Sequence, residues 1–259
     1  TTPFQTNFDT LPWRSLKSTQ DRMGSLDTAW CVKKNDSLRY AWFISNIYAH
    51  RNPYVFRDES LSGPDYDHSG SQGVGNFLFS HAFDHDSTEG QVLATPYFDI
   101  SNLNSPELRF WYYMYGEDID RLVIMAREMN TAWQRLDSLV GEHQHGFEEL
   151  WKEYYVPLSG MGDTVQLAFV SYKNSSGYDG NIAIDLVNVD QKPSCQTPRF
   201  PTVSQIQTST VHINFIPGGD ATSFEVIFGA HGFRPAKAQV QIVPTNCPLH
   251  TTDAAHADD

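Results

Sequence analysis

Asp185 is the residue of this sequence with the clearest chemical requirement. It lies inside an apolar run, residues 181–189, which reads Asn-Ile-Ala-Ile-Asp-Leu-Val-Asn-Val. A carboxylate buried in such a run without a partner is costly. We therefore expect a cation or a hydrogen-bond donor beside Asp185. The alternative to a cation is an aspartate that caps a strand end or accepts bonds from backbone amides.

Two groups of histidines have spacings that zinc sites use. Residues 142–145 read Glu-His-Gln-His, with Glu148 and Glu149 shortly after. A His-x-His pair faces one way on a strand, and a glutamate could add a third ligand. No His-Glu-x-x-His motif supports this, so the sequence favours an exposed loop. His81 and His85, four residues apart, have polar surroundings that also favour a loop.

Catalytic patterns are weak. A glycosidase needs two carboxylates about 5 to 10 Å apart, and Glu117, Asp118 and Asp120, or Glu148 and Glu149, could be nominated. A chain with 31 acidic residues contains such pairs by chance. No Gly-x-Ser-x-Gly nucleophile motif occurs. The sequence therefore predicts a protein that is not an enzyme.

Aromatic residues make up 13% of the chain and could include sugar-stacking rings on an exposed face. The alternative for each ring is packing under loops. The candidates are Trp13, Tyr48, Tyr54, Tyr112, Tyr113, Tyr154, Tyr155 and Tyr178.

Short β-type runs must position these residues. The runs are rich in β-branched and aromatic residues and cover residues 108–114, 122–126, 165–172 and 181–189. Residues 147–155 are the best helix candidate, but Pro157 follows closely and residues 151–158 also fit a strand, which we favour. Many short strands with frequent turn signals predict an all-β sandwich or jelly roll.

The bulk composition excludes several functions. The net charge of −13 argues against nucleic acid and against anionic lipid. No stretch approaches the length of a membrane span, and the chain begins without a signal sequence, so an exported protein would already have lost it. The spacing of Cys31, Cys195 and Cys247 fits no zinc-binding or redox motif. It does not decide whether Cys195 and Cys247 form a disulfide.

A boundary is expected at residues 191–197, which have linker composition. We predict domains at 1–191 and 192–259. The second contains strand-like runs at 211–215, 224–228 and 240–243, and a turn at 217–220. At about 65 residues it is shorter than a complete seven-stranded sandwich of roughly 100, so we expect an incomplete immunoglobulin-like β-sandwich.

The first domain resembles the MAM domain, the extracellular jelly roll of meprins, neuropilins and receptor phosphatases. Seven motifs carry the resemblance in order: Asn7-Phe8-Asp9; Trp42; Gly63-Pro64 with Asp67-His68-Ser69; Gly75-Asn76-Phe77-Leu78; Leu93-Ala94-Thr95-Pro96; residues 108–116; and Gly180-Asn181-Ile182-Ala183-Ile184-Asp185. The family's second closing aspartate is Leu186 here, and its disulfide pattern is absent. The cysteine-poor pattern is closer to the cleaved-adhesin and MAM-like domains of Bacteroidetes surface proteins. The second domain resembles their fibronectin type III-like repeats, with the final strands missing.

The resemblance implies a structural calcium ion with Asp9 and Asp185 as ligands, and Asp67 more loosely. It implies a secreted or surface-exposed adhesion protein that binds a host or cell-surface protein or glycan. Two alternatives stay open: a carbohydrate-binding accessory module of a glycan-processing system, and a fragment of a larger secreted hydrolase.

Overall fold

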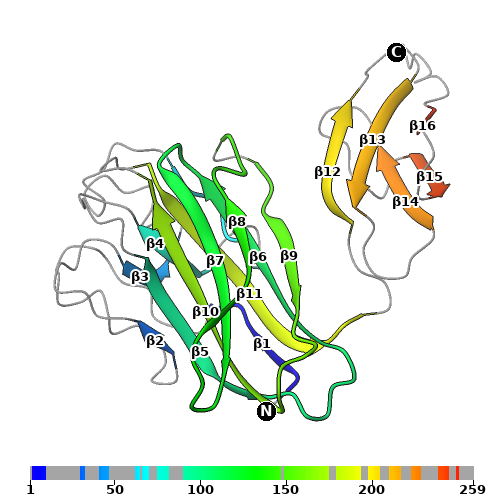
Figure 1. The fold of residues 1–259 in the computed structure, drawn as a ribbon. Coiled ribbons are helices and arrows are strands. Elements are labelled where there is room, and N and C mark those ends of the chain that lie inside the picture. The colour runs from blue at the N-terminus through cyan, green and yellow to red at the C-terminus, as the bar shows by residue number, and fades with distance from the viewer. Residues whose placement is uncertain are drawn as a thin grey trace. The chain divides into compact units, whose positions relative to one another are not determined.

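Strands of two to eleven residues dominate the first part of the chain, because its β-branched and aromatic runs are short and divided by turn residues. The computed structural model describes residues 2–9, 30–32, 41–46, 62–64, 66–69, 75–81, 90–146, 149–174, 179–193, 198–204, 210–216, 223–228, 239–244 and 249–250. In these ranges the chain is all-β, as predicted (Figure 1). None of the described residues forms a helix that could cross a membrane.

The chain divides into two compact units, Thr1–Gln191 and Lys192–Asp259. The first is a jelly-roll sandwich of two antiparallel sheets. The six-stranded sheet has the order β3-β4-β11-β6-β9, with β1 paired to β11, and the five-stranded sheet has the order β2-β5-β10-β7-β8. The strands are β1 (Phe4–Thr6), β2 (Cys31–Val32), β3 (Ala41–Ser45), β4 (Phe77–His81), β5 (Gln91–Asp99), β6 (Pro106–Tyr115), β7 (Ile119–Glu128), β8 (Gln134–Val140), β9 (Lys152–Pro157), β10 (Thr164–Lys173) and β11 (Asn181–Gln191).

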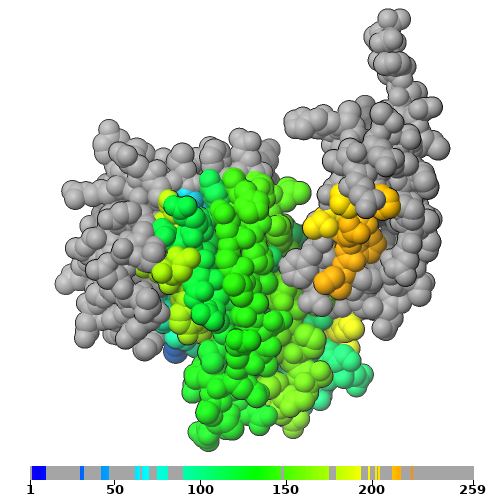
Figure 2. All heavy atoms as spheres, turned by 45° about the horizontal axis from the view of Figure 1, so that its top comes forward, coloured from blue at the N-terminus to red at the C-terminus, as the bar shows by residue number. Residues whose placement is uncertain are grey.

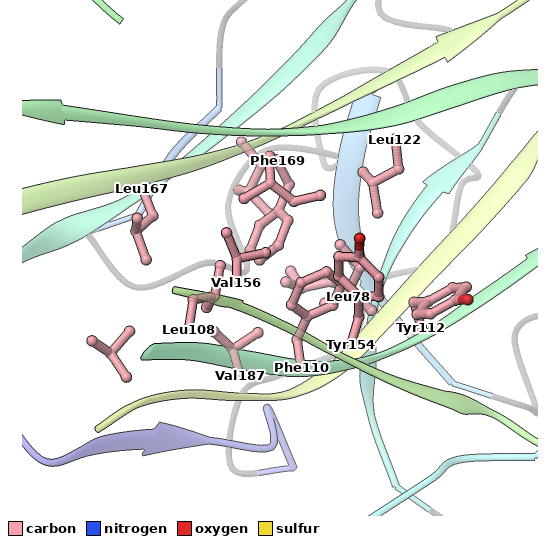
Figure 3. Close-up of a cluster of buried hydrophobic side chains, with 14 of the residues drawn as sticks. Leu78, Leu108, Phe110, Tyr112, Leu122, Tyr154, Val156, Leu167, Phe169 and Val187 are labelled. Carbon is pink, nitrogen blue, oxygen red and sulfur yellow. The ribbon is translucent and has the colours of Figure 1, made fainter. Parts of the chain in front are cut away.

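The main core lies between these two sheets and follows the period-2 alternation of strands. Along β10 it takes Leu167 and Phe169, and along β6 it takes Leu108 and Phe110. Figure 3 shows these four side chains in one cluster with others from β4, β7, β9 and β11. Phe110 and Phe169, on opposite sheets, meet edge to face with ring centroids 5.0 Å apart. This contact ties the two layers together.

A second apolar cluster covers the other face of the six-stranded sheet. Its buried members are Phe43, Phe77, Phe79, Tyr113, Trp151 and Ala183. Strands β6 and β11 therefore have apolar neighbours on both faces. This explains why both read as nearly continuous apolar runs instead of alternating with polar residues.

Residues 147–155, the best helix candidate, do not form a helix where they are described. β9 occupies Lys152–Pro157, so the preference for a strand there is confirmed. Its pairing with β6 places Tyr154 opposite Phe110 and Val156 opposite Leu108. Both β9 residues join the main core, which supplies the burial that a short isolated helix would lack.

The second unit is smaller and also built of strands. They are β12 (Arg199–Ser204), β13 (Thr210–Ile216), β14 (Ser223–Phe228), β15 (Gln239–Pro244) and β16 (Leu249–His250). β12-β13-β16 form one sheet and β14-β15 another. The predicted turn at 217–220, Cys195 and Cys247 lie outside the described residues. The described cysteine, Cys31, is exposed and has a free thiol.

Candidate functional site

Asp185 lies in β11, between β4 and β6, and its side chain is 0% exposed. The pairing of β11 with β6 shifts register between Asp185 and Asn188, and Leu186 in this bulge has a φ of +48°. Bulges of this kind re-aim neighbouring side chains. Asp185 Oδ1 accepts a hydrogen bond from the Leu186 amide (2.6 Å), and Oδ2 accepts one from the Ser69 amide (3.0 Å). Two backbone amides thus supply some of the hydrogen bonds that this buried carboxylate requires.

Asp67 reaches the same place from the segment 66–69. It is 1% exposed, and the Ser69 hydroxyl donates to its Oδ2 at 3.5 Å. Ser69 therefore contacts both Asp67 and Asp185. Stacking of His68 on the Trp111 ring holds the segment against the outer face of β6, with the ring centroids 3.8 Å apart. Trp151 Nε1 adds a hydrogen bond to the carbonyl of Tyr66 (3.0 Å).

Asp9 lies three residues beyond the end of β1 and is not part of a strand. The chain leaves β1 through Phe8, a buried residue with a φ of +61°, and this turn presents the carboxylate of Asp9. Asp9 Oδ1 accepts a hydrogen bond from the Asn76 amide (2.8 Å), and Oδ2 accepts one from Asn7 Nδ2 (2.7 Å). Asn76 Nδ2 also donates to the carbonyls of Phe8 and Asp9. The end of β1 is thereby fixed to the start of β4.

Gly75 is where the carboxylates of Asp9 and Asp67 meet. A Cβ atom at this position would overlap Asp9 Oδ1 and would lie 2.5 Å from Asp67 Oδ2. The glycine is required here by the close approach of two carboxylates to its Cα. We call Asp9, Asp67 and Asp185, with Ser69 and Gly75 between them, the acidic cluster.

Negative charge on the buried carboxylates of the acidic cluster is electrostatically unfavourable. Burial first, and then the charge of nearby Asp67, raise the pKa of Asp185 to about 8, although hydrogen bonds from Ser69 and Leu186 oppose the shift. Two buried carboxylates side by side favour either a shared proton or a cation. Hard oxygen donors of this type suit calcium.

The side chains of the acidic cluster do not by themselves provide all the ligands that a metal ion needs. Across the described ranges, no three His, Cys, Asp or Glu side chains are arranged to hold a metal ion. Calcium takes six to eight oxygens, including amide and backbone carbonyl oxygens and water. The backbone carbonyls of Phe8 and Asp9 are oxygens of this type and lie in the same turn as the Asp9 carboxylate, where they accept bonds from Asn76 Nδ2.

The structure brings Asp9, Asp67 and Asp185 together, although 176 positions separate the first from the last in the sequence. Ser69 and Gly75 were missed as site residues. Both lie in motifs that carry the family resemblance, so motif membership was the available signal. Their contacts could not be inferred from spacing, because Ser69 is 116 positions from Asp185.

The histidine group does not form a zinc site in the described residues. His143 is half-buried in the loop after β8, and its Nδ1 lies 2.7 Å from the hydroxyl of Tyr112. His145 is exposed and lies 3.4 Å from Glu142. Burial lowers the pKa of His143, and the neighbouring charge of Lys152 lowers it further. Glu148, His85 and the side chain of His81 lie outside the described residues.

The described rings among the sugar-stacking candidates are buried. Tyr112, Tyr113, Tyr154 and Tyr155 are each at most 5% exposed, so packing is their role. The other candidates, Trp13, Tyr48, Tyr54 and Tyr178, lie outside the described residues.

A family model described as "MAM domain, meprin/A5/mu" matches residues 27–196, well over half of the chain. The fold is similar to the K1 cleaved adhesin domain of Lys-gingipain from Porphyromonas gingivalis W83, at 14% identity over 74% of this chain and 100% of that one, with a TM-score of 0.45. It is similar to the K2 cleaved adhesin domain of Lys-gingipain at 13% identity over 73% and 98%, with a TM-score of 0.47. TmCBM61 in complex with β-1,4-galactotriose matches at 12% identity over 63% and 89%, with a TM-score of 0.37.

Proposed function

Because the chain belongs to the MAM domain family, we propose that it is an extracellular, non-catalytic binding module that attaches to a protein or glycan at a cell surface. The observation that carries this proposal is the enclosure of the acidic cluster. Asp185 and Asp67 are 0% and 1% exposed, so no substrate reaches their carboxylates. The carboxyl of Asp185, whose pKa burial raises to about 8, thus serves the fold.

We further propose that the acidic cluster holds a structural calcium ion. Asp9, Asp67 and Asp185 would supply carboxylate oxygens, and the ion would supply the positive charge that the buried pair lacks. Leu186 stands where the family has a second aspartate, so one ligand of the family pattern is missing. The ion would join the end of β1 to the segment 66–69 and to β11.

The same proposal extends to the kind of cell surface on which the protein occurs. The cysteine-poor first unit, with Cys31 as its one cysteine, fits a Bacteroidetes-type surface protein better than a disulfide-linked animal receptor. The second unit would then be a fibronectin type III-like spacer. A carbohydrate-binding accessory module is the second candidate function. The outward face of the five-stranded sheet favours it, because Arg127 lies there against the rings of Tyr97 and Trp133.

The hydrolase alternative has less support. A pocket of about 280 Å³ is lined by Glu117, Glu142 and Asp179. However, Glu142 Oε1 accepts the amide of Gly116 at 3.0 Å, and its Oε2 lies 3.4 Å from His145. This glutamate is therefore engaged in local structure.

Whole-cell binding tests the adhesion proposal. The fluorescently labelled chain is incubated with bacterial and animal cells, in calcium and in chelator, before and after protease or periodate treatment of the cells. We expect saturable binding that one of the two treatments removes. Absence of saturable binding to every surface would contradict the proposal, as would turnover of a glycan by the chain alone.

A further inference from the structure

The outward face of the five-stranded sheet carries a row of polar and aromatic side chains in register. Gln166 of β10 is paired with Tyr97 of β5 on one side and with Arg127 of β7 on the other. Directly opposite residues of antiparallel strands share a face. Their neighbours Val165 and Leu167 point into the main core, so this row points outward. Figure 2 shows the green surface that includes β7 and β8 lying open along the first unit.

Arg127 is held in place more firmly than a surface arginine usually is. Its guanidinium carbon lies 4.5 Å from the Trp133 ring centroid and 5.9 Å from that of Tyr97. Its Nε donates to Gln166 Oε1 (2.8 Å), and Gln166 Nε2 donates to the carbonyl of Thr95 (2.8 Å). Gln166 is buried, so this chain of hydrogen bonds is fixed.

The terminal nitrogens of Arg127 are left for another molecule. In the described part of the chain, the hydrogen bond of this guanidinium is made by Nε alone. Two flanking rings reduce its contact with water, and a planar guanidinium binds carboxylate or sulfate oxygens in a bidentate manner. The Tyr97 ring is 37% exposed, so it also offers apolar surface beside the charge.

We call Arg127, Tyr97, Trp133 and Gln166 the Arg127 patch. Further arginines extend it along the β7–β8 hairpin. Arg135 is exposed and, through its pairing with Met125, lies on the same face as Arg127. Arg121 lies six positions along β7, about 20 Å away at the usual strand rise, and its guanidinium carbon is 5.7 Å from the Tyr172 ring centroid.

The described acidic residues named beside this face are Asp120 and Asp99, and each has a local partner. Arg121 pairs with Asp120 at 2.8 Å. Asp99 of β5, opposite Thr164, faces the same side, and its carboxylate accepts bonds from the Ser101 amide and hydroxyl. The three arginines named here outnumber Asp99 and Asp120 by one, so these residues give the face a small net positive charge on a chain of net charge −13.

Building on the proposed function, we propose that this face binds an acidic glycan. Arg127 anchors a carboxylate or sulfate group, Tyr97 and Trp133 flank the sugar ring, and Arg135 contacts a second acidic group. Charge complementarity selects an anionic ligand, and amphipathic rings beside a fixed donor suit a pyranose better than a purely charged chain. The net negative charge repels long polyanions, so short acidic stretches should bind and added salt should weaken them.

Calorimetry with defined probes tests this inference on the full chain. The probes are tetragalacturonate, its methyl ester, a chondroitin sulfate tetrasaccharide and a glutamate decapeptide. We expect at least one acidic oligosaccharide to bind and the methyl ester to bind at least about tenfold more weakly. Arg127→Gln should weaken acidic binding by at least about tenfold, the scale expected for losing a charge-assisted bidentate contact. Trp133→Ala should weaken it severalfold.

Arg109→Gln is the matched control. Arg109 lies on the outward face of β6, in the other sheet, and binds Asn188. The Arg109→Gln variant should bind the acidic oligosaccharide with an affinity within about twofold of the wild type. Unchanged melting temperatures would separate lost contacts from lost folding.

Several results would overturn the inference. Equal binding of the methyl ester would show that charge is not recognised, and binding of the decapeptide alone would make this an acidic-peptide site. If no probe binds and attachment to cells is sensitive to protease, the proposal that this face binds an acidic glycan is refuted. The adhesion proposal would remain. Failure of both assays would remove both proposals.

Discussion

Replacing Asp185 by asparagine should stabilise the chain in chelator and destabilise it in calcium. The pKa of Asp185 is about 8 in the fold against an ordinary 3.8. Between these values the folded state holds a proton that the unfolded state has released, so stability falls as pH rises through this window. At 1.36 kcal/mol per pH unit, the loss is on the order of 5 kcal/mol by pH 8 and is absent below about pH 4.

The asparagine removes this penalty but introduces a smaller one. One carboxylate oxygen becomes an NH₂ donor, so the amide of Ser69 or Leu186 loses its acceptor. An unsatisfied buried amide costs about 1–3 kcal/mol. In chelator at pH 8, Asp185→Asn should therefore raise the free energy of unfolding by about 2–4 kcal/mol. In calcium the sign should reverse, because the variant lacks a ligand and the wild type loses its penalty.

Urea unfolding at about pH 5 and pH 8, each with calcium and with chelator, measures all four values. Asp190→Asn is the matched control on the same strand. Among the described residues, its carboxylate accepts one bond, from the neighbouring Gln191 amide, so the substitution should change stability by less than about 0.5 kcal/mol. Equal stability of the wild type in chelator at both pH values would refute the raised pKa of Asp185. A calcium response of the Asp185 variant equal to that of the wild type would refute its role as a ligand.

Three further substitutions have expected outcomes. Gly75→Ala should cost about 1–3 kcal/mol in thermal unfolding and remove the calcium response, because its Cβ would displace the carboxylates of Asp9 and Asp67; an unchanged calcium shift would contradict this. Leu186→Asn should stabilise the chain by roughly 1 kcal/mol, since asparagine tolerates a φ of +48°, and a lower urea midpoint would refute it. Phe169→Ala should cost about 3–5 kcal/mol, as expected for a fully buried aromatic between two sheets, and a loss below 1 kcal/mol would show that the core closes over the cavity.

The sequence allowed the fold class to be predicted because local patterns were strong where both faces of a strand are buried. β6 and β11 could be located from their apolar runs. β8 could not, because it is an edge strand with a single buried residue, Leu139, among polar neighbours. Its position depends on pairing with β7, which no local pattern encodes.

The candidate site was predictable only in part, for a related reason. The need of Asp185 for a partner followed from its apolar neighbours, and the family resemblance added Asp9 and Asp67. The contacts of Ser69 and Gly75 arise from approaches between distant segments. The Arg127 patch was missed altogether, because its rings come from β5 and from the turn before β8.

The pairing of β1 with β11 also has a mechanical consequence. Phe4 lies opposite Val189 and Thr6 opposite Val187, so the first and last strands of the unit leave from the same end of one antiparallel ladder. A pulling force applied through these two strands would open their hydrogen bonds one after another, from Phe4 inward. The acidic cluster begins three residues after this short ladder ends. With a cation bound there, peeling would stop at Asp9, and the ion would set the force at which an attached module of this kind gives way.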